Sequence, residues 1–144
     1  MQCIIFIGIP ASGKSSFYKE NFFNSHIRVS LDLLNTRNKQ QKLMEYCFAT
    51  QSRFIIDNTN VTIEERANYI SILKEKKYEI VAYYFETNLQ DALERNENRK
   101  DTIPDIGVKS KFKQLEVPNY EEGFDKVYNV SIENNQFKVE EYEI

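Results

Sequence analysis

Short apolar runs alternate with amphipathic stretches along the whole chain. Strands are predicted for the short apolar runs, at residues 3–7, 27–30, 53–56, 79–85 and 126–132. Helices are predicted between them, at residues 14–23, 38–50, 62–76, 88–98 and 104–115. This alternation predicts an α/β fold with a parallel sheet of about five strands, sandwiched by helices. The alternating stretch 136–142 is expected to add an edge hairpin through Asn134 and Asn135.

Two predicted helices begin at residues typical of helix caps, and the segment between the last two predicted helices has a distinctive composition. Thr62 with Glu65 three residues later matches a capping box, and Asn88 is a predicted helix cap. Residues 99–104 are polar and contain no apolar anchor, so we expect them to form a short lid between two helices. A chain of 144 residues fits one domain, residues 1–144.

Charge is unevenly placed along the chain. Residues 116–144 hold eight acidic and two basic side chains, a balance of −6, and the net charge of the chain is −3. Residues 1–115 therefore carry 17 basic and 14 acidic side chains, a balance of +3. A mildly basic body permits a phosphate-rich substrate but excludes the strong basic footprint of a constitutive nucleic-acid binder.

The cysteine pattern and the hydropathy bear on compartment. Cys3 and Cys47 form no CxxC pair and show no metal-ligand spacing, so both are expected to be small buried hydrophobic residues. No signal peptide is expected before the first strand, and no apolar run reaches the ~20 residues that a membrane span needs. These features predict a cytoplasmic protein without a membrane partner, and they leave the oligomeric state open.

The strongest motif follows the first predicted strand. Residues 8–15 read Gly-Ile-Pro-Ala-Ser-Gly-Lys-Ser, which matches G-x-x-x-x-G-K-[ST] in full. Glycines turn backbone N–H groups toward an anion, the lysine neutralises the β- and γ-phosphates, and the serine hydroxyl binds Mg²⁺. We therefore predict an ATP·Mg²⁺ site, against the alternative of a plain glycine turn. Its cofactor-binding residues are predicted to be Gly8, Pro10, Ala11, Ser12, Gly13, Lys14, Ser15 and Ser16.

The acceptor of the phosphate depends on other residues. Asp32 follows the second predicted strand, where ligands of parallel sheets bind, and its carboxylate suits a general base or a helix cap. Asp57 ends the third strand and is expected to hold Mg²⁺ with Ser15. Arg95 and Arg99 lie four residues apart, so they suit either transition-state charge or a solvated face paired with nearby carboxylates.

The turn after Asp57 offers further polar groups. Asn58, Thr59 and Asn60 are candidates for substrate binding together with Asp57 and Arg37, or they simply form a polar turn.

These motifs resemble the polynucleotide 5′-hydroxyl kinases, including the kinase half of the bifunctional repair kinase-phosphatases. The resemblance covers nearly the whole chain and is carried by residues 8–15, 29–33, 55–60, 95–99 and 112–125. It implies that Asp32 is the general base for the 5′-OH, and that Lys14 and Ser15 bind phosphate and Mg²⁺. It further implies that Arg95 and Arg99 are catalytic lid arginines, and that Asp57 and Thr59 lie beneath the acceptor.

The chain departs from the family on the acceptor side. Leu31 and Asn35 stand where the family often has arginines, and Arg37 is nearby but out of register. The expected function is ATP-dependent phosphorylation of a 5′-OH end on DNA or RNA. The alternatives are a P-loop kinase of a small-molecule hydroxyl, such as a nucleoside or sugar acid, and a nucleotide-binding regulator with little turnover.

Overall fold

A computed structural model describes residues 1–100 and 102–142, and this part of the chain contains one six-stranded sheet. Its strands are β1 (Gln2–Ile7), β2 (Ile27–Val29), β3 (Phe54–Ile56), β4 (Glu79–Phe85), β5 (Lys126–Glu133) and β6 (Gln136–Glu141). Their order across the sheet is β2-β3-β1-β4-β5-β6, and all pairs are parallel except β5 with β6. The predicted parallel sheet is therefore confirmed, with the predicted hairpin at its edge, where Asn134 and Asn135 have positive φ.

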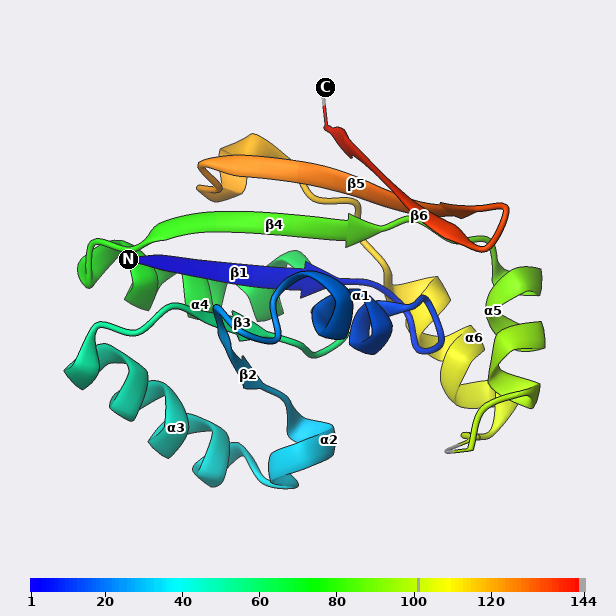
Figure 1. Ribbon diagram of the computed structural model, residues 1–144, viewed down its shortest axis with the longest axis horizontal. Coiled ribbons are helices and arrows are strands. Elements are labelled where there is room, and N and C mark those ends of the chain that lie inside the picture. The colour runs from blue at the N-terminus through cyan, green and yellow to red at the C-terminus, as the bar shows by residue number, and fades with distance from the viewer. Residues whose placement is uncertain (101, 143–144) are drawn as a thin grey trace.

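The helices occupy both faces and one end of the sheet (Figure 1). They are α1 (Lys14–Asn21), α2 (Leu31–Leu34), α3 (Arg37–Thr50), α4 (Ile63–Glu75), α5 (Leu89–Glu97), α6 (Asp105–Gln114) and a 3₁₀ turn η1 (Tyr120–Glu122). The short helix α2 was not predicted. The Thr62 and Asn88 side chains accept the backbone N–H groups of Glu65 and Asp91, as helix caps do. For Thr62 this is the first half of the predicted capping box, and the reciprocal bond to Glu65 is not present among the described residues.

The alternating direction of side chains along β1 explains why the hydrophobic core lies on both faces of the sheet. Cys3, Ile5 and Ile7 belong to a buried cluster with side chains of α3 and α4. Ile4 and Phe6 face the other way, into a cluster with Phe17 and Tyr18 of α1. Because side chains alternate along a strand, a strand buried on both faces must be apolar throughout. The centre of the sheet is thus covered on both faces, so a ligand site can open only at its ends, and the glycine loop follows the carboxyl end of β1.

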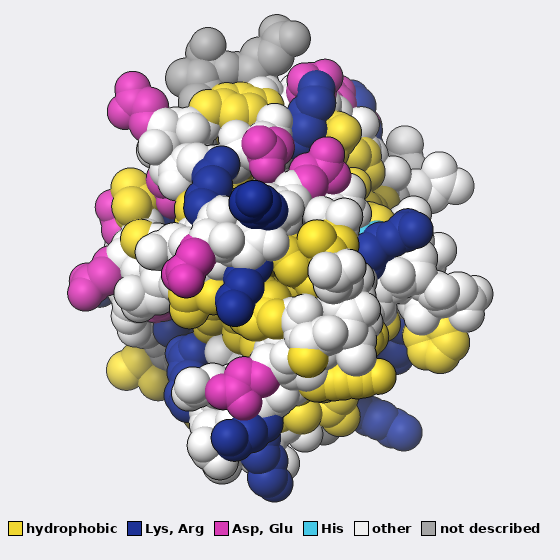
Figure 2. Space-filling model, turned by 90° about the vertical axis from the view of Figure 1, so that its left-hand side faces the viewer, with side chains coloured by type: hydrophobic (Ala, Val, Ile, Leu, Met, Phe, Trp, Pro, Cys, Tyr) yellow, Lys and Arg dark blue, Asp and Glu magenta, His cyan; other side chains and the backbone are white. Residues whose placement is uncertain are grey.

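The cysteines and the surface can be compared with the expectations from composition. Both cysteines are buried and free, as predicted. Among the described residues, no helix is long and apolar enough to cross a membrane. On the side that holds the amino ends of the strands, basic and acidic side chains are interspersed, with hydrophobic side chains exposed between them (Figure 2).

Candidate active site

A cleft of about 510 Å³ opens where β1 and β3 end. It brings together every predicted site residue except Gly8: Pro10, Ala11, Ser12, Gly13, Lys14, Ser15, Ser16, Asp32, Arg37, Asp57, Asn58, Thr59, Asn60, Arg95 and Arg99. These residues come from six separate stretches of a chain of 144 residues, so their convergence follows from the fold and not from sequence proximity. Their individual roles stay predictions. Ligands of open parallel sheets bind outside the carboxyl ends of the strands, which is where this cleft lies.

The glycine loop between β1 and α1 is built around Lys14. Its Nζ donates to the carbonyl oxygens of Gly8 and Ile9 at 3.1 and 3.0 Å, so the ammonium lies inside the loop. Burial lowers the pKa of Lys14 to about 8, while the carboxylates of Asp57 and Asp32 act in the opposite direction. An ammonium held there with a depressed pKa gains from any anion that enters the loop.

The end of the loop meets the requirements for a phosphate site. Gly13 has φ +98°, and a Cβ there would lie 3.0 Å from the ring of Phe137 on β6. No side chain caps the start of α1, and no acidic residue lies in its first turn. The uncapped N–H groups and the positive end of the helix dipole therefore face the cleft together with Lys14. This donor set fits a triphosphate.

Gly8 supports the loop from outside the cleft. Its N–H donates to the carbonyl of Thr59 at 3.0 Å, which ties the glycine loop to the polar turn after β3. A Cβ on Gly8 would lie 2.8 Å from the Ser12 hydroxyl and 3.0 Å from Phe85 Cβ. The glycine is thus needed for close packing of the loop, and its predicted contact with the cofactor stays a prediction.

Asp32 lies in the first turn of α2, with its side chain exposed to the cleft. The amide oxygen of Asn58 accepts the N–H of Leu31 at 2.9 Å, and the amide nitrogen of Asn58 donates to Gln40 on α3 at 2.8 Å. Asn58 therefore takes the place of a helix cap and fixes α2 to the turn after β3. These two bonds use one N–H and one lone pair of the amide, so they fix its orientation without using all of its hydrogen-bonding groups.

Asn60 is similarly engaged. It is 2% exposed, has φ +47°, and donates to the carbonyl of Phe6 at 2.8 Å. This side chain fastens the turn to β1. Of the polar turn residues, Asn58 and Thr59 are the partly exposed ones, while Asp57 and Asn60 are buried.

Asp57 and Ser15 are brought together by an arginine that sequence reasoning missed. Arg28 on β2 donates through Nε to Asp57 Oδ2 at 2.7 Å and through Nη2 to Ser15 Oγ at 3.1 Å. The carboxylate and the hydroxyl thus face one position that accommodates a positive charge. Oxygen donors of this kind fit Mg²⁺, which takes its remaining ligands from phosphates and water.

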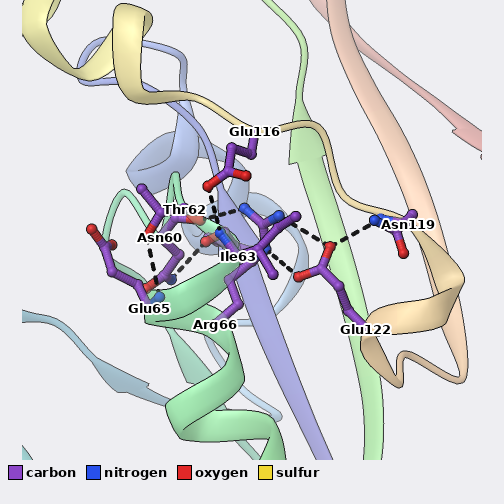
Figure 3. Close-up of polar contacts among 9 residues, drawn as sticks. Asn60, Thr62, Ile63, Glu65, Arg66, Glu116, Asn119 and Glu122 are labelled. Atoms are coloured by element: carbon purple, nitrogen blue, oxygen red, sulfur yellow. Dashed lines mark hydrogen bonds and ion pairs between the residues drawn. The ribbon is translucent and has the colours of Figure 1, made fainter.

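A buried ion pair holds the same turn from behind (Figure 3). Arg66 on α4 is fully buried, pairs with both carboxylate oxygens of Glu122 at 2.8 and 3.0 Å, and donates to the carbonyl of Asn60 at 2.9 Å. Glu122 also accepts the N–H of Asn119, and Glu116 accepts that of Ile63. The chain segment around residues 116–122 therefore supports the polar turn, although it lies outside the cleft.

The lid differs from the prediction. The stretch after α5 does have an apolar anchor, because Ile103 packs in a cluster with residues of α5 and α6. The buried Asn96 holds Ile103 through both main-chain groups, at 2.7 and 3.2 Å. Arg99 lies beyond the end of α5 and not on the helix, yet it lines the same cleft as Arg95. Asp101, part of the predicted lid, lies outside the described residues.

The charges of the cleft favour an anionic ligand. The predicted alternative, a solvated face with carboxylates paired to the lid arginines, is not what the described residues show, since Asn88 and Gln90 donate to Asp91 and Glu94 instead. Lys111 and Glu65 also line the cleft, and no sequence signal marked either as a site residue, because single charged residues on amphipathic helices are usually solvent-facing. In total the lining holds five basic and three acidic side chains, although the whole chain has a net charge of −3.

A larger cavity of about 830 Å³ lies between α3 and α4 and shares only Arg37 and Glu65 with the cleft. Its walls include Met44, Phe48 and Ile72, and it lacks the glycine loop. The smaller cleft therefore holds the chemistry of a nucleotide site, although the cavity between α3 and α4 is larger.

Comparison with known proteins supports the resemblance seen in the sequence. A bifunctional polynucleotide phosphatase/kinase of Schizosaccharomyces pombe is 28% identical over 135 residues, 90% of this chain and 33% of that protein. A putative enzyme of the same name from Acanthamoeba polyphaga mimivirus is 32% identical over 139 residues, with the same coverage. An L-seryl-tRNA(Sec) kinase of Methanococcus maripaludis is 25% identical, over 85% of this chain and 55% of that protein. The chain thus spans about one third of the length of the first two relatives.

Solved structures share the fold at low identity. A gluconokinase from Sinorhizobium meliloti superposes with a TM-score of 0.57 at 16% identity, covering 90% of this chain and 82% of that one. Kti12 of Chaetomium thermophilum in complex with ADP-AlF3 gives 0.62 at 13%, covering 90% and 88%. A family model described as an AAA domain matches residues 30–119. That match covers more than half of the chain, and the chain therefore belongs to this AAA domain family, with the fold of a P-loop kinase.

Proposed function

We propose that this protein transfers the γ-phosphate of ATP to the 5′-hydroxyl end of a DNA or RNA strand. The observation that carries the proposal is the convergence of the glycine loop, Asp32 and the two lid arginines on one cleft. The two relatives named polynucleotide phosphatase/kinase supply the acceptor class, because they match over 90% of this chain.

The donor side of the cleft would hold the triphosphate. The N–H groups of the loop and the start of α1 would bind the phosphates, and Lys14 would exchange its bonds to loop carbonyls for the β- and γ-oxygens. Ser15 and Asp57 would hold Mg²⁺, which neutralises charge on the phosphates. Arg95 and Arg99 would face the charge that spreads over the transferring group.

The acceptor side would begin at Asp32. The carboxylate takes the proton of the attacking hydroxyl as the oxygen bonds to the γ-phosphorus, and the bond from phosphorus to the β–γ bridging oxygen breaks to release ADP. Since α2 is capped by Asn58, the carboxylate is held on an element fixed to the turn beneath the acceptor. The acceptor strand is expected to leave along the basic cleft and not across the mixed-charge face of Figure 2.

A second candidate is a kinase of a small-molecule hydroxyl. Leu31 lines the cleft beside Asp32, and the nearby Arg37 donates to the Tyr69 hydroxyl at 2.9 Å, so few cations are directed at a phosphodiester backbone. This arrangement suits a compact acceptor as well as a strand end.

One assay separates the two functions. Label transfer from γ-labelled ATP is measured to a panel of 5′-OH oligonucleotides, matched 5′-phosphate oligonucleotides, nucleosides and sugar acids. The proposal predicts labelling of 5′-OH oligonucleotides alone, and none of the 5′-phosphate controls. Labelling of nucleosides or sugar acids at higher kcat/KM than any oligonucleotide would replace it with the second candidate.

A further inference from the structure

Arg28 contacts two residues of the donor side, Asp57 and Ser15, although nothing in the glycine-loop motif calls for an arginine there. It is the middle residue of the three-residue strand β2, and its guanidinium spans Asp57 and Ser15, the two groups expected to hold the metal. The guanidinium also lies 6.0 Å from the ring centre of Tyr18 on α1. Side chains of α1 and of the turn after β3 thus meet at this one residue of β2.

The charge at Asp57 explains why a cation is needed there. The Asp57 side chain is only 2% exposed, and a buried carboxylate without a partner is strongly destabilising. Arg28 supplies the compensating charge in the nucleotide-free protein, while its own side chain stays 24% exposed. The arginine therefore has a route to solvent that the carboxylate does not have.

A guanidinium and a magnesium ion cannot both bind Asp57 and Ser15 without repelling each other. Both are cations directed at the same carboxylate and the same hydroxyl, and like charges about 4 Å apart in a partly buried site repel strongly. When Mg²⁺ arrives with the nucleotide, one cation must give way. Mg²⁺ would come bound to the phosphates, whereas the Arg28 side chain is partly exposed and can turn toward solvent when Asp57 is bound by the metal.

We propose that Arg28 is a built-in counter-cation of the metal site, which neutralises Asp57 while the site is empty and is displaced by Mg²⁺. The proposal rests on the nucleotide·Mg²⁺ site of the proposed function and adds a residue that sets how strongly that site depends on metal. With Arg28 present, metal-free nucleotide meets a neutral Asp57–Arg28 pair instead of a bare carboxylate. The affinity gained from Mg²⁺ is correspondingly small, because Mg²⁺ must first displace the arginine.

The test measures binding and not turnover. The Kd of ADP is determined by calorimetry in EDTA and in saturating Mg²⁺, and the ratio of the two values is compared between variants. Arg28→Gln should raise this ratio about tenfold or more, because metal-free ADP then meets an unpaired carboxylate and Mg²⁺ has no competitor. Arg28→Lys keeps the charge, and Arg53→Gln removes an exposed arginine elsewhere, so both should stay within about twofold of the wild type.

Each outcome has a defined meaning. An unchanged ratio in Arg28→Gln, with ADP still bound, overturns the role of Arg28 and leaves the proposed function intact. Failure of the wild type to bind ADP in either condition overturns both. If Arg28→Gln does not fold, the comparison is made in the Asp57→Asn background, where no buried carboxylate is left unpaired. Since that background has no carboxylate for Arg28 to neutralise, removing Arg28 from it should leave the ratio within about twofold, and a rise of about tenfold there would overturn the role of Arg28 as counter-cation of Asp57.

Discussion

The depressed pKa of Lys14 makes nucleotide binding pH-dependent in a predictable direction. In the nucleotide-free protein this pKa is about 8, below its usual 10.5, chiefly because of burial in the loop. Bound phosphates bring negative charge within reach of Nζ and raise the pKa again. The bound state therefore holds more protons above pH 8 than the free state does.

The number of protons taken up on binding follows from the protonation of Lys14 in the free and bound states. With a free-state pKa of about 8, nucleotide binding should take up about half a proton at pH 8 and about 0.9 proton at pH 9. The affinity for nucleotide should be highest well below pH 8. It should weaken as pH rises through 8, by up to about tenfold per pH unit. The phosphates do not contribute in this range, because their last ionisation lies near pH 6.

Calorimetry in buffers of different ionisation enthalpy measures this proton uptake directly. Lys14→Arg is the control, since a guanidinium stays protonated to above pH 12 and should show no uptake between pH 8 and 9. Binding by the wild type without proton uptake at pH 9 would refute the reasoning. Equal uptake by Lys14→Arg would assign the proton to another group.

Two further predictions concern the buried Arg66–Glu122 ion pair and the lid. Arg66→Leu should lower the free energy of unfolding by about 3–5 kcal/mol in urea titrations, because it leaves the Glu122 carboxylate buried and unpaired. The double change with Glu122→Leu should recover much of this loss, and the exposed Glu121→Gln should have little effect; a wild-type midpoint for Arg66→Leu would contradict the buried pair. The amides of Arg99 and Thr102 should exchange hydrogen more slowly with a saturating ATP analogue, and equal rates with and without it would contradict nucleotide-dependent closure of the lid.

Local patterns in the sequence carried much of the fold and the donor site. The continuous apolar run before Gly8 predicts a strand buried on both faces, and the glycine loop that follows predicts the phosphate site. Asn88 and Thr62 mark their helices because a helix cap needs only a nearby side chain. These features depend on residues within a few positions of one another.

The parts that sequence reasoning missed depend on contacts across the fold. Helix α2 has four residues and is capped by Asn58 from another segment, so no local signal marks it. Arg28 and Asp57 are 29 residues apart, and Arg66 and Glu122 are 56 apart. Single charged residues of this kind look like solvated positions until the sheet order brings their partners together.

The proposed transfer is tested most directly through Asp32. Asparagine keeps the size of the side chain and caps a helix as well as aspartate does, but it cannot accept the proton of the attacking hydroxyl. We therefore measure kcat for transfer from γ-labelled ATP to a 5′-OH oligonucleotide by Asp32→Asn and by the wild type. The account predicts a fall of about 10²–10⁴. Transfer by Asp32→Asn at the wild-type rate would contradict it and remove Asp32 from the mechanism.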